Sequence, residues 1–179
     1  AARDNARLNG YRGIQFPWQS GNTGSEVTPY YAGAAGGITE QHINLDVAFA
    51  FAQYVHATGD ELFLRQQAWP VLEGVAEWIA SRVTRTGRGY EIRHITGPDE
   101  GLDNIHNNSY TNMAAIVVLR EAIAMARGLG LPPPAAWMDI ENDMVLPIDP
   151  KTQVILKNDG YEYTGGMCVP ETMGGFFPF

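Results

Sequence analysis

The fold is decided by residues 42–60, which read HINLDVAFAFAQYVHATGD. The apolar side chains of this stretch recur every three or four residues, at Ile43, Val47, Phe51, Tyr54 and Val55. That spacing places them on one face of an α-helix. Thr39 is suited to cap this helix, because its hydroxyl can accept a backbone N–H, and Glu40 would then lie in the favoured first turn. Thr58-Gly59-Asp60 predicts the helix end, since glycine commonly follows the last helical residues.

The residues around this helix predict further helices. A second apolar stripe follows at Leu72, Val75, Ala76, Ile79 and Val83. Pro70, just before it, either starts a new helix or bends an existing one. A link of a few residues makes the two helices an antiparallel pair. Shorter patterns predict three more helices, over 1–9, 113–126 and 135–144, and two strands, over 90–95 and 154–156.

These elements predict a mainly α fold, a helical bundle or toroid with long loops and minor β structure. The chain has 179 residues, 45% of them apolar, enough for one compact domain over residues 1–179. The sequence contains no run of about eighteen apolar residues, the length needed to span a membrane. The first residues lack the apolar segment of a signal peptide, which processing could have removed, so the compartment stays open.

Composition also restricts the partners. The formal net charge of −8 argues against nucleic acid, because phosphate binding needs clustered Lys and Arg. The single cysteine, Cys168, excludes an internal disulfide. A neutral polyol or sugar suits a chain with 11% aromatic residues and four tryptophans. We predict a carbohydrate partner and neither a cofactor nor a metal.

The main candidate for a functional site is the turn Ile95-Thr96-Gly97-Pro98-Asp99-Glu100. Pro98 fits neither a helix interior nor a central strand, and Gly97 relaxes the backbone, so a turn is predicted. Asp99 and Glu100 leave it side by side, and the following residues are rich in Asn, His, Ser and Tyr. Such a loop either carries catalytic groups or is a solvated turn followed by a helix cap.

A second candidate is the loop over residues 11–26, which has no helical or alternating period. Its notable side chains are Phe16, Trp18, Gln19 and Glu26. The loop either packs on the core or lines a pocket. On the helix that follows, His42 and Asp46 are four residues apart and share a face, which is typical of a structural hydrogen bond more often than of a site.

Together these segments resemble glycoside hydrolase family sixty-five. Residues 10–29 are similar to the family segment G-Y-x-G-A-x-F-P-W-E-S-x-x-T-G-x-E-x-x-P, and residues 42–46 to its H-I-x-x-D-I-A helix. Further matches are 58–64 with T-G-D-x-x-F-L, 78–82 with F-W-A-S-R, 97–100 with G-P-D-E, and 107–112 with N-N-x-Y-T-N. The resemblance covers most of residues 5–164, in the order of the family's motifs.

The family acts on α-glucosides such as maltose, kojibiose, trehalose and glucosylated collagen, by hydrolysis or phosphorolysis with inversion. The resemblance implies an incomplete segment of an (α/α)6 barrel, without the family's N-terminal β-sandwich or the last barrel helices. Family phosphorylases usually read P-W-R-T-I where this chain has Pro17-Trp18-Gln19-Ser20, so a hydrolase is favoured. Two alternatives stay open. One is a phosphorylase, and the other is a non-catalytic fragment that binds sugar or serves only as a scaffold. Apolar edges exposed by the missing helices predict oligomerisation.

The resemblance also assigns roles by position. Glu100 matches the general acid, Trp18 matches the aromatic of the glucose subsite, and Gln19 stands where many relatives have Glu. Asp99 could favour the protonated form of Glu100 by like-charge repulsion.

The remaining candidates are less specific. Asp99, Asn108 and Asn112 are substrate-binding candidates, and either asparagine would serve equally well in the loop or as a helix cap. The family's general base, and an aspartate upstream of Trp18, would lie outside these residues. Glu171 is the late carboxylate in a plausible loop and is therefore the candidate base.

Overall fold

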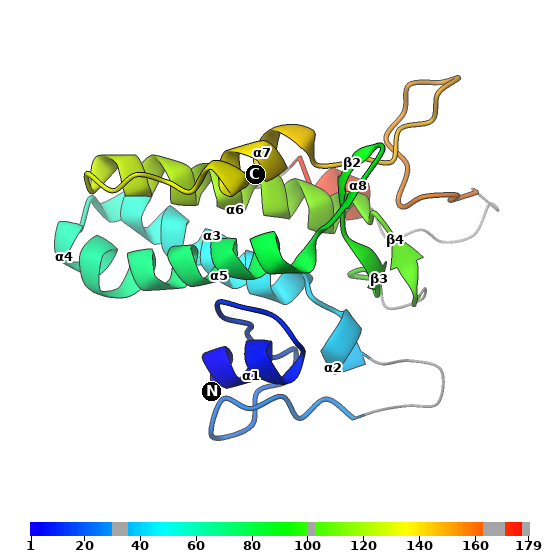
Figure 1. Cartoon of the computed structure of the whole chain (residues 1–179). Helices are drawn as coiled ribbons and strands as arrows, with labels where there is room; N and C mark the ends of the chain where they lie inside the picture. Colours follow the sequence, from blue (N-terminus) through cyan, green and yellow to red (C-terminus); the bar gives the residue numbers. More distant parts are fainter. Residues whose placement is uncertain (30–35, 100–102, 163–170, 177–179) are drawn as a thin grey trace.

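The structure, a computed structural model, describes residues 1–29, 36–99, 103–162 and 171–176. Its centre is a group of long helices that run side by side (Figure 1). They are α3 (His42–Thr58), α5 (Trp69–Arg82), α6 (Ser109–Gly128) and α7 (Ala135–Asp143). Helix α6 packs against the other three, and its inner residues Ala114, Ala115, Val118, Leu119 and Ala122 are fully buried. The predicted mainly α fold is confirmed.

Helices α3 and α5 form the predicted antiparallel pair (Figure 1). Gly59 ends α3 in a left-handed conformation with φ 64°, which glycine adopts without steric cost. Asp60 then caps the next helix by accepting a hydrogen bond from the N–H of Phe63 (2.9 Å). The apolar stripe of α5 faces inward, with Leu72, Val75, Ala76 and Ile79 fully buried.

The polypeptide stays helical from Glu61 to Arg82 but changes helix type. A short α4 (Glu61–Phe63) leads into a π-helical turn, η1 (Leu64–Ala68), and then into α5. The N–H of Trp69 bonds the carbonyl of Leu64, five residues back, and Pro70 occupies the first turn of α5. Proline has no N–H to donate, so it is tolerated where a helical register begins. Pro70 therefore starts a new register without interrupting the helix.

The predicted cap at Thr39 is wrong. Helix α3 begins at His42, and Thr39 ends a separate short helix, α2 (Gly36–Thr39). The hydroxyls of Thr39 and Thr96 lie 2.9 Å apart, and the N–H of Thr96 bonds the carbonyl of Thr39 (3.1 Å). Thr39 is thus committed to a contact 57 residues away in the sequence.

Two short antiparallel ladders lie at one end of the helices (Figure 1). Strand β1 (Thr84–Thr86) pairs with β2 (Gly89–Glu91), and β3 (Arg93–Ile95) pairs with β4 (Ile105–His106). The strand predicted over 90–95 is therefore divided, because the buried Ile92 separates two ladders. The strand predicted over 154–156 is wrong, since it amounts to one bridge between Ile148 and Ile155.

The N-terminal segment covers α3 and α5. Helix α1 (Ala2–Leu8) confirms the helix predicted there, and the loop after it packs on the core. The side chain of Asn44, fully buried on α3, bonds the N–H of Phe16 (3.0 Å) and the carbonyl of Ile14 (3.1 Å). The N–H of Ile14 bonds the carbonyl of Gly74 on α5 (3.0 Å).

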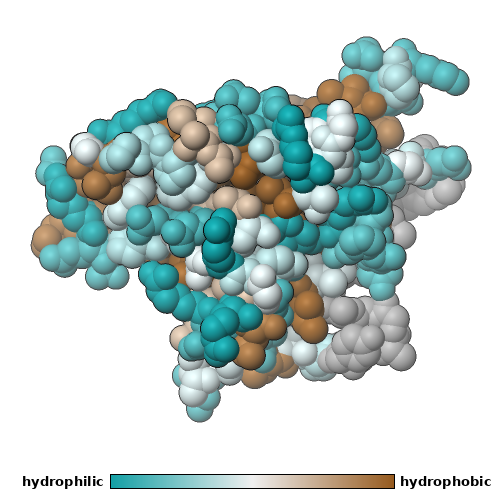
Figure 2. All heavy atoms as spheres, viewed as in Figure 1, coloured by the Kyte–Doolittle hydropathy of each residue, from teal (hydrophilic) through white to brown (hydrophobic). Residues whose placement is uncertain are grey.

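The face of the molecule seen in Figure 2 is largely polar. Figure 2 shows hydrophilic side chains over most of the visible face, with smaller hydrophobic patches between them. Large apolar side chains that are exposed include Leu8, Leu62, Val154, Met173 and Phe176. Among the described residues, no helix has the length and apolar character needed to cross a membrane.

Candidate active site

Three rings from three separate segments meet at the start of α3. Trp18 comes from the N-terminal loop, His42 from the first turn of α3, and Tyr110 from the first turn of α6. The ring centroids of Trp18 and His42 are 5.4 Å apart, and those of His42 and Tyr110 are 5.8 Å apart, both edge to face. Edge-to-face packing favours these pairs beyond the area that they bury.

His42 lies between two carboxylates. Its Nδ1 is 2.8 Å from Oδ2 of Asp46, and its Nε2 is 3.3 Å from Oε1 of Glu40. The predicted His42–Asp46 hydrogen bond is confirmed. Burial alone would lower the pKa of His42, but the hydrogen bonds and charges of Asp46 and Glu40 outweigh it and raise that pKa to about 9. His42 is therefore a cation at neutral pH.

Tyr110 completes this network, because its hydroxyl donates to Oδ1 of Asp46 (2.7 Å). Burial, together with the bond and charge of Asp46, raises the pKa of Tyr110 far above its ordinary value. The hydroxyl therefore stays protonated and keeps donating. Asp46 thus joins α3 to the N-terminal end of α6, with one oxygen on His42 and the other on Tyr110.

Glu26 holds the backbone that carries Trp18 and Gln19. The N–H of Trp18 bonds Oε2 of Glu26 (2.7 Å), and the N–H of Gln19 bonds the hydroxyl of Thr28 (3.1 Å) and Oε1 of Glu26 (3.3 Å). The N–H of Thr28 also bonds Oε1 of Glu26 (2.9 Å). Trp18 is half-buried and Gln19 is exposed. The loop is thus packed on the core and still presents Trp18 and Gln19 at its surface.

The turn predicted to carry the general acid, called the acid turn below, follows β3, and the chain returns to the same ladder in β4. Asp99 is nearly buried and forms an ion pair with Lys157, whose side chain is only 7% exposed. Glu100, the predicted general acid, lies outside the described residues. Lys157 was not among the candidates, because no local pattern pairs it with Asp99 across 57 intervening residues.

The asparagines of the N-N-x-Y-T-N segment serve the start of α6. Asn108 is the N-cap, since its Oδ1 accepts from the N–H of Thr111 (3.0 Å), and the expected cap role is confirmed. The amide nitrogen of Asn112 bonds the carbonyl of Val145 (2.7 Å) and Oδ1 of Asn107 (3.2 Å). Both candidates are fully buried, and the protein engages the amide of Asn108 and the amide nitrogen of Asn112, whereas Oδ1 of Asn112 has no hydrogen-bond partner among the described residues.

The candidate base, Glu171, begins α8 (Glu171–Gly174), which packs against α6. The next residue, Thr172, places its hydroxyl 3.0 Å from that of Ser109 in the first turn of α6. The side chain of Glu171 is outside the described part of the chain. Within the described ranges, no group of three or more His, Cys, Asp or Glu side chains is placed to hold a metal ion.

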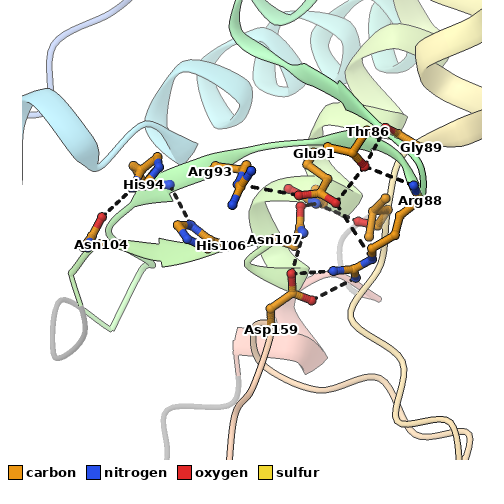
Figure 3. A network of polar contacts seen from close by, with 12 residues as sticks. Thr86, Arg88, Gly89, Glu91, Arg93, His94, Asn104, His106, Asn107 and Asp159 are labelled. Carbon is orange, nitrogen blue, oxygen red and sulfur yellow. Dashed lines mark hydrogen bonds and ion pairs between the residues drawn. The ribbon is translucent and has the colours of Figure 1, made fainter.

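A second polar network joins the two ladders to the segment after α7 (Figure 3). Two guanidinium nitrogens of Arg88 donate hydrogen bonds to the carboxylate of Asp159, at 2.8 and 3.0 Å. The amide nitrogen of Asn107 donates to the same carboxylate (2.7 Å). Partial burial would raise the pKa of Asp159, but Arg88 and Asn107 lower it on balance. Asp159 therefore stays ionised, and it was not among the predicted residues.

The chain belongs to glycosyl hydrolase family 65, because the model of that family's central catalytic domain matches residues 1–169. The resemblance noted in the sequence is thereby confirmed. The chain is 42% identical to a kojibiose hydrolase from Flavobacterium johnsoniae over 147 residues, which cover 82% of this chain and 21% of that one. It is 34% identical to a kojibiose phosphorylase from Escherichia coli, over 83% of this chain and 22% of that one.

Other comparisons agree. The chain is 36% identical to a protein-glucosylgalactosylhydroxylysine glucosidase from Gallus gallus, over 88% of this chain and 22% of that protein. A solved kojibiose phosphorylase from the human microbiome superposes with a TM-score of 0.72 at 20% identity, over 89% of this chain and 23% of that one. That likeness supports the fold, and the helix pairs are consistent with part of a helical toroid. The chain spans about a fifth of the length of these relatives.

Proposed function

We propose that this chain is the acid-bearing part of an inverting glycoside hydrolase that acts on α-glucosides. Glu100 is the general acid, and Trp18 and Gln19 contact the glucose residue at the cleaved bond. The completed fold is an (α/α)6 barrel in which this chain supplies only some of the helices. Its hydrolase relative from Flavobacterium johnsoniae, at 42% identity, supports hydrolysis as the reaction.

One observation carries the proposal: the acid turn and the Trp18 loop are both tied to the first turn of α6. Asp99 pairs with Lys157, whose carbonyl accepts from the N–H of Ser109 (2.8 Å). On the other side, Trp18 packs on His42, which packs on Tyr110, the residue after Ser109. Residues that a glycosidase must keep in register thus share one fixed support.

The chemistry requires two groups. The acid donates a proton to the leaving glycosidic oxygen, while a second group activates the nucleophile on the other face of the sugar, roughly 6.5–9.5 Å away. Trp18 offers an apolar ring to the C–H face of glucose, and Gln19 offers an exposed amide to its hydroxyls. Asn108 and Asn112 support the acid turn. Glu171 is the candidate for the second carboxylate.

The Glu100→Gln variant of the full-length protein tests this directly. We expect loss of kojibiose hydrolysis by about 10²–10⁴-fold, the usual contribution of a general acid, while glucose still quenches or shifts tryptophan fluorescence. Kojibiose is the first substrate to try because two of the relatives, a hydrolase and a phosphorylase, are named for it. Undiminished turnover of kojibiose by the variant would overturn the assignment of Glu100.

The second candidate function is phosphorolysis, favoured by the Escherichia coli relative at 34% identity. Release of glucose 1-phosphate only when inorganic phosphate is present would establish it, whereas phosphate-independent release of glucose supports the hydrolase. A chain that binds sugar without catalysis would show the fluorescence response to glucose and neither product. Absence of that response at saturating glucose would count against the Trp18 subsite.

A further inference from the structure

A buried lysine pairs with the residue next to the proposed acid. The chain has two lysines, of which Lys151 is exposed and Lys157 is buried against Asp99. Taking an ammonium and a carboxylate out of water is costly, and this cost is offset only by close pairing and further hydrogen bonds. The buried pair is nevertheless present at the turn that leads to Glu100. This argues that it has a function other than stabilising the fold.

The backbone of Lys157 cannot shift freely. Its carbonyl accepts from the N–H of Ser109 (2.8 Å) and from the amide of Asn108 (3.4 Å), the cap of α6. Its ammonium also lies 5.9 Å from the ring centre of Tyr161, within the range of a cation–π contact. The ammonium that holds Asp99 is therefore fixed relative to the start of a long, buried helix.

Asp159 holds the same segment from the other side. Two residues after Lys157, its carboxylate bonds the amide of Asn107 and both terminal nitrogens of Arg88 (Figure 3). Arg88 belongs to the β1–β2 turn, and Asn107 follows β4. The segment over 157–159 thus connects the acid turn, both ladders and the start of α6.

We propose that Lys157 is a positioning residue for the acid step: its ion pair with Asp99 holds the turn that carries Glu100 against the first turn of α6. The inference rests on the proposed role of Glu100 as the acid. It also revises the expected role of Asp99. Like-charge repulsion between Asp99 and Glu100 is offset, because Lys157 compensates the charge of Asp99. Asp99 anchors the turn through this pair.

Two substrates separate this role from general stability. Kojibiose needs a proton on its leaving oxygen, whereas α-glucosyl fluoride releases fluoride without help from an acid. In the full-length protein, we expect Lys157→Met to lower kcat for kojibiose about 10- to 100-fold, a part of what a general acid contributes. The kcat for the fluoride should stay within about three-fold of the original. Lys157→Arg should recover kojibiose turnover, and the matched control Lys151→Met should leave both rates unchanged.

Asp99→Asn removes the same ion pair with little change of shape, and it should give the same split between the two substrates. If Lys157→Met and Asp99→Asn lower both rates equally, or neither rate, the positioning role is wrong. The proposed acid fails separately: it is wrong if Glu100→Gln keeps its kojibiose turnover. A kojibiose-specific loss in Glu100→Gln without one in Lys157→Met therefore overturns only this inference.

Discussion

His42 holds its proton between Glu40 and Asp46 at the start of α3, and the ring of Trp18 packs edge to face with the imidazole ring of His42. The imidazolium offsets one of the two negative charges that the fold brings together there. If the proton were lost, Glu40 and Asp46 would face each other across a neutral ring, and the hydrogen bonds that orient the ring would weaken. The geometry around Trp18 therefore depends on the protonation of His42.

This dependence predicts how stability changes with pH. The pKa of His42 is raised from 6.5 to about 9 on folding, so its stabilisation is complete below pH 6.5 and is lost as the pH rises through 9. At about 1.4 kcal/mol per pKa unit, we expect a loss of about 1–3 kcal/mol across this window. Thermal unfolding at several pH values would measure it.

The comparison needs two variants. His42→Gln should flatten the change in melting temperature between pH 6.5 and 9, because it removes the titrating group. Gln53→Ala, at an exposed position of the same helix and without a titrating group, should keep the original slope. Equal slopes in the original protein and His42→Gln would contradict the assignment.

At this scale, residues with local signals could be predicted and residues with distant partners could not. The spacing of His42 and Asp46 on one helix face predicted their hydrogen bond, because helix geometry alone brings them together. Tyr110 contacts Asp46 over 64 residues, and Lys157 contacts Asp99 over a similar separation. No pattern in the sequence encodes such pairs until the fold is known.

At the scale of elements, the start of α6 is bonded to several segments that are distant in the sequence. Asn107, Asn108 and Ser109 are all fully buried, and each bonds a different segment of the chain or caps the helix. Asn107 adopts φ 52°, a left-handed conformation that asparagine tolerates better than most residues. Because the proposed acid turn connects here through Lys157, and Trp18 connects here through His42 and Tyr110, damage to this helix end should affect the whole proposed site.

Loss of the helix cap should therefore be measurable. Asn108→Ala removes the acceptor for the N–H of Thr111, and we expect the free energy of unfolding to fall by about 0.5–2 kcal/mol. Urea titration followed by circular dichroism would measure this fall. Asn142→Ala on the exposed side of α7 is the control and should change stability by less than about 0.5 kcal/mol. An equal effect of the two substitutions would contradict the capping role.

Helices were predictable from their apolar period, and their junctions were less so. The stripes of α3, α5 and α6 located all three helices, because burial of one face dominates their stability. Thr39 was wrongly predicted as a cap because its hydroxyl contacts Thr96 instead. The π-helical turn before Trp69 and the division of the strand at Ile92 depend on packing between elements, which the local sequence does not contain.

At the scale of the whole molecule, exposed apolar side chains predict self-association. A hollow of about 230 Å³ lies beside α6 and α8, and its lining is mostly apolar: Met113, Ile116, Val117, Arg120, Gly175 and Phe176. Phe176 is itself 57% exposed. We expect the 179-residue chain to elute from size exclusion as a species larger than its monomer, and Phe176→Ser to shift it toward the monomer. Elution of the unmodified chain as a clean monomer would contradict this expectation.

The β3–β4 pair has a consequence for how members of this family diversify. The ladder holds Ile95 beside Ile105, and the backbone N–H of His94 bonds Nδ1 of His106 (3.1 Å). The two ends of the intervening segment are thus fastened to each other, whatever lies between them. Lengthening a closed loop costs little, roughly 0.6 kcal/mol for each doubling. Insertions between Glu100 and β4 are therefore expected to accumulate in evolution, while the hairpin and the helices beside it stay under unchanged selection for packing.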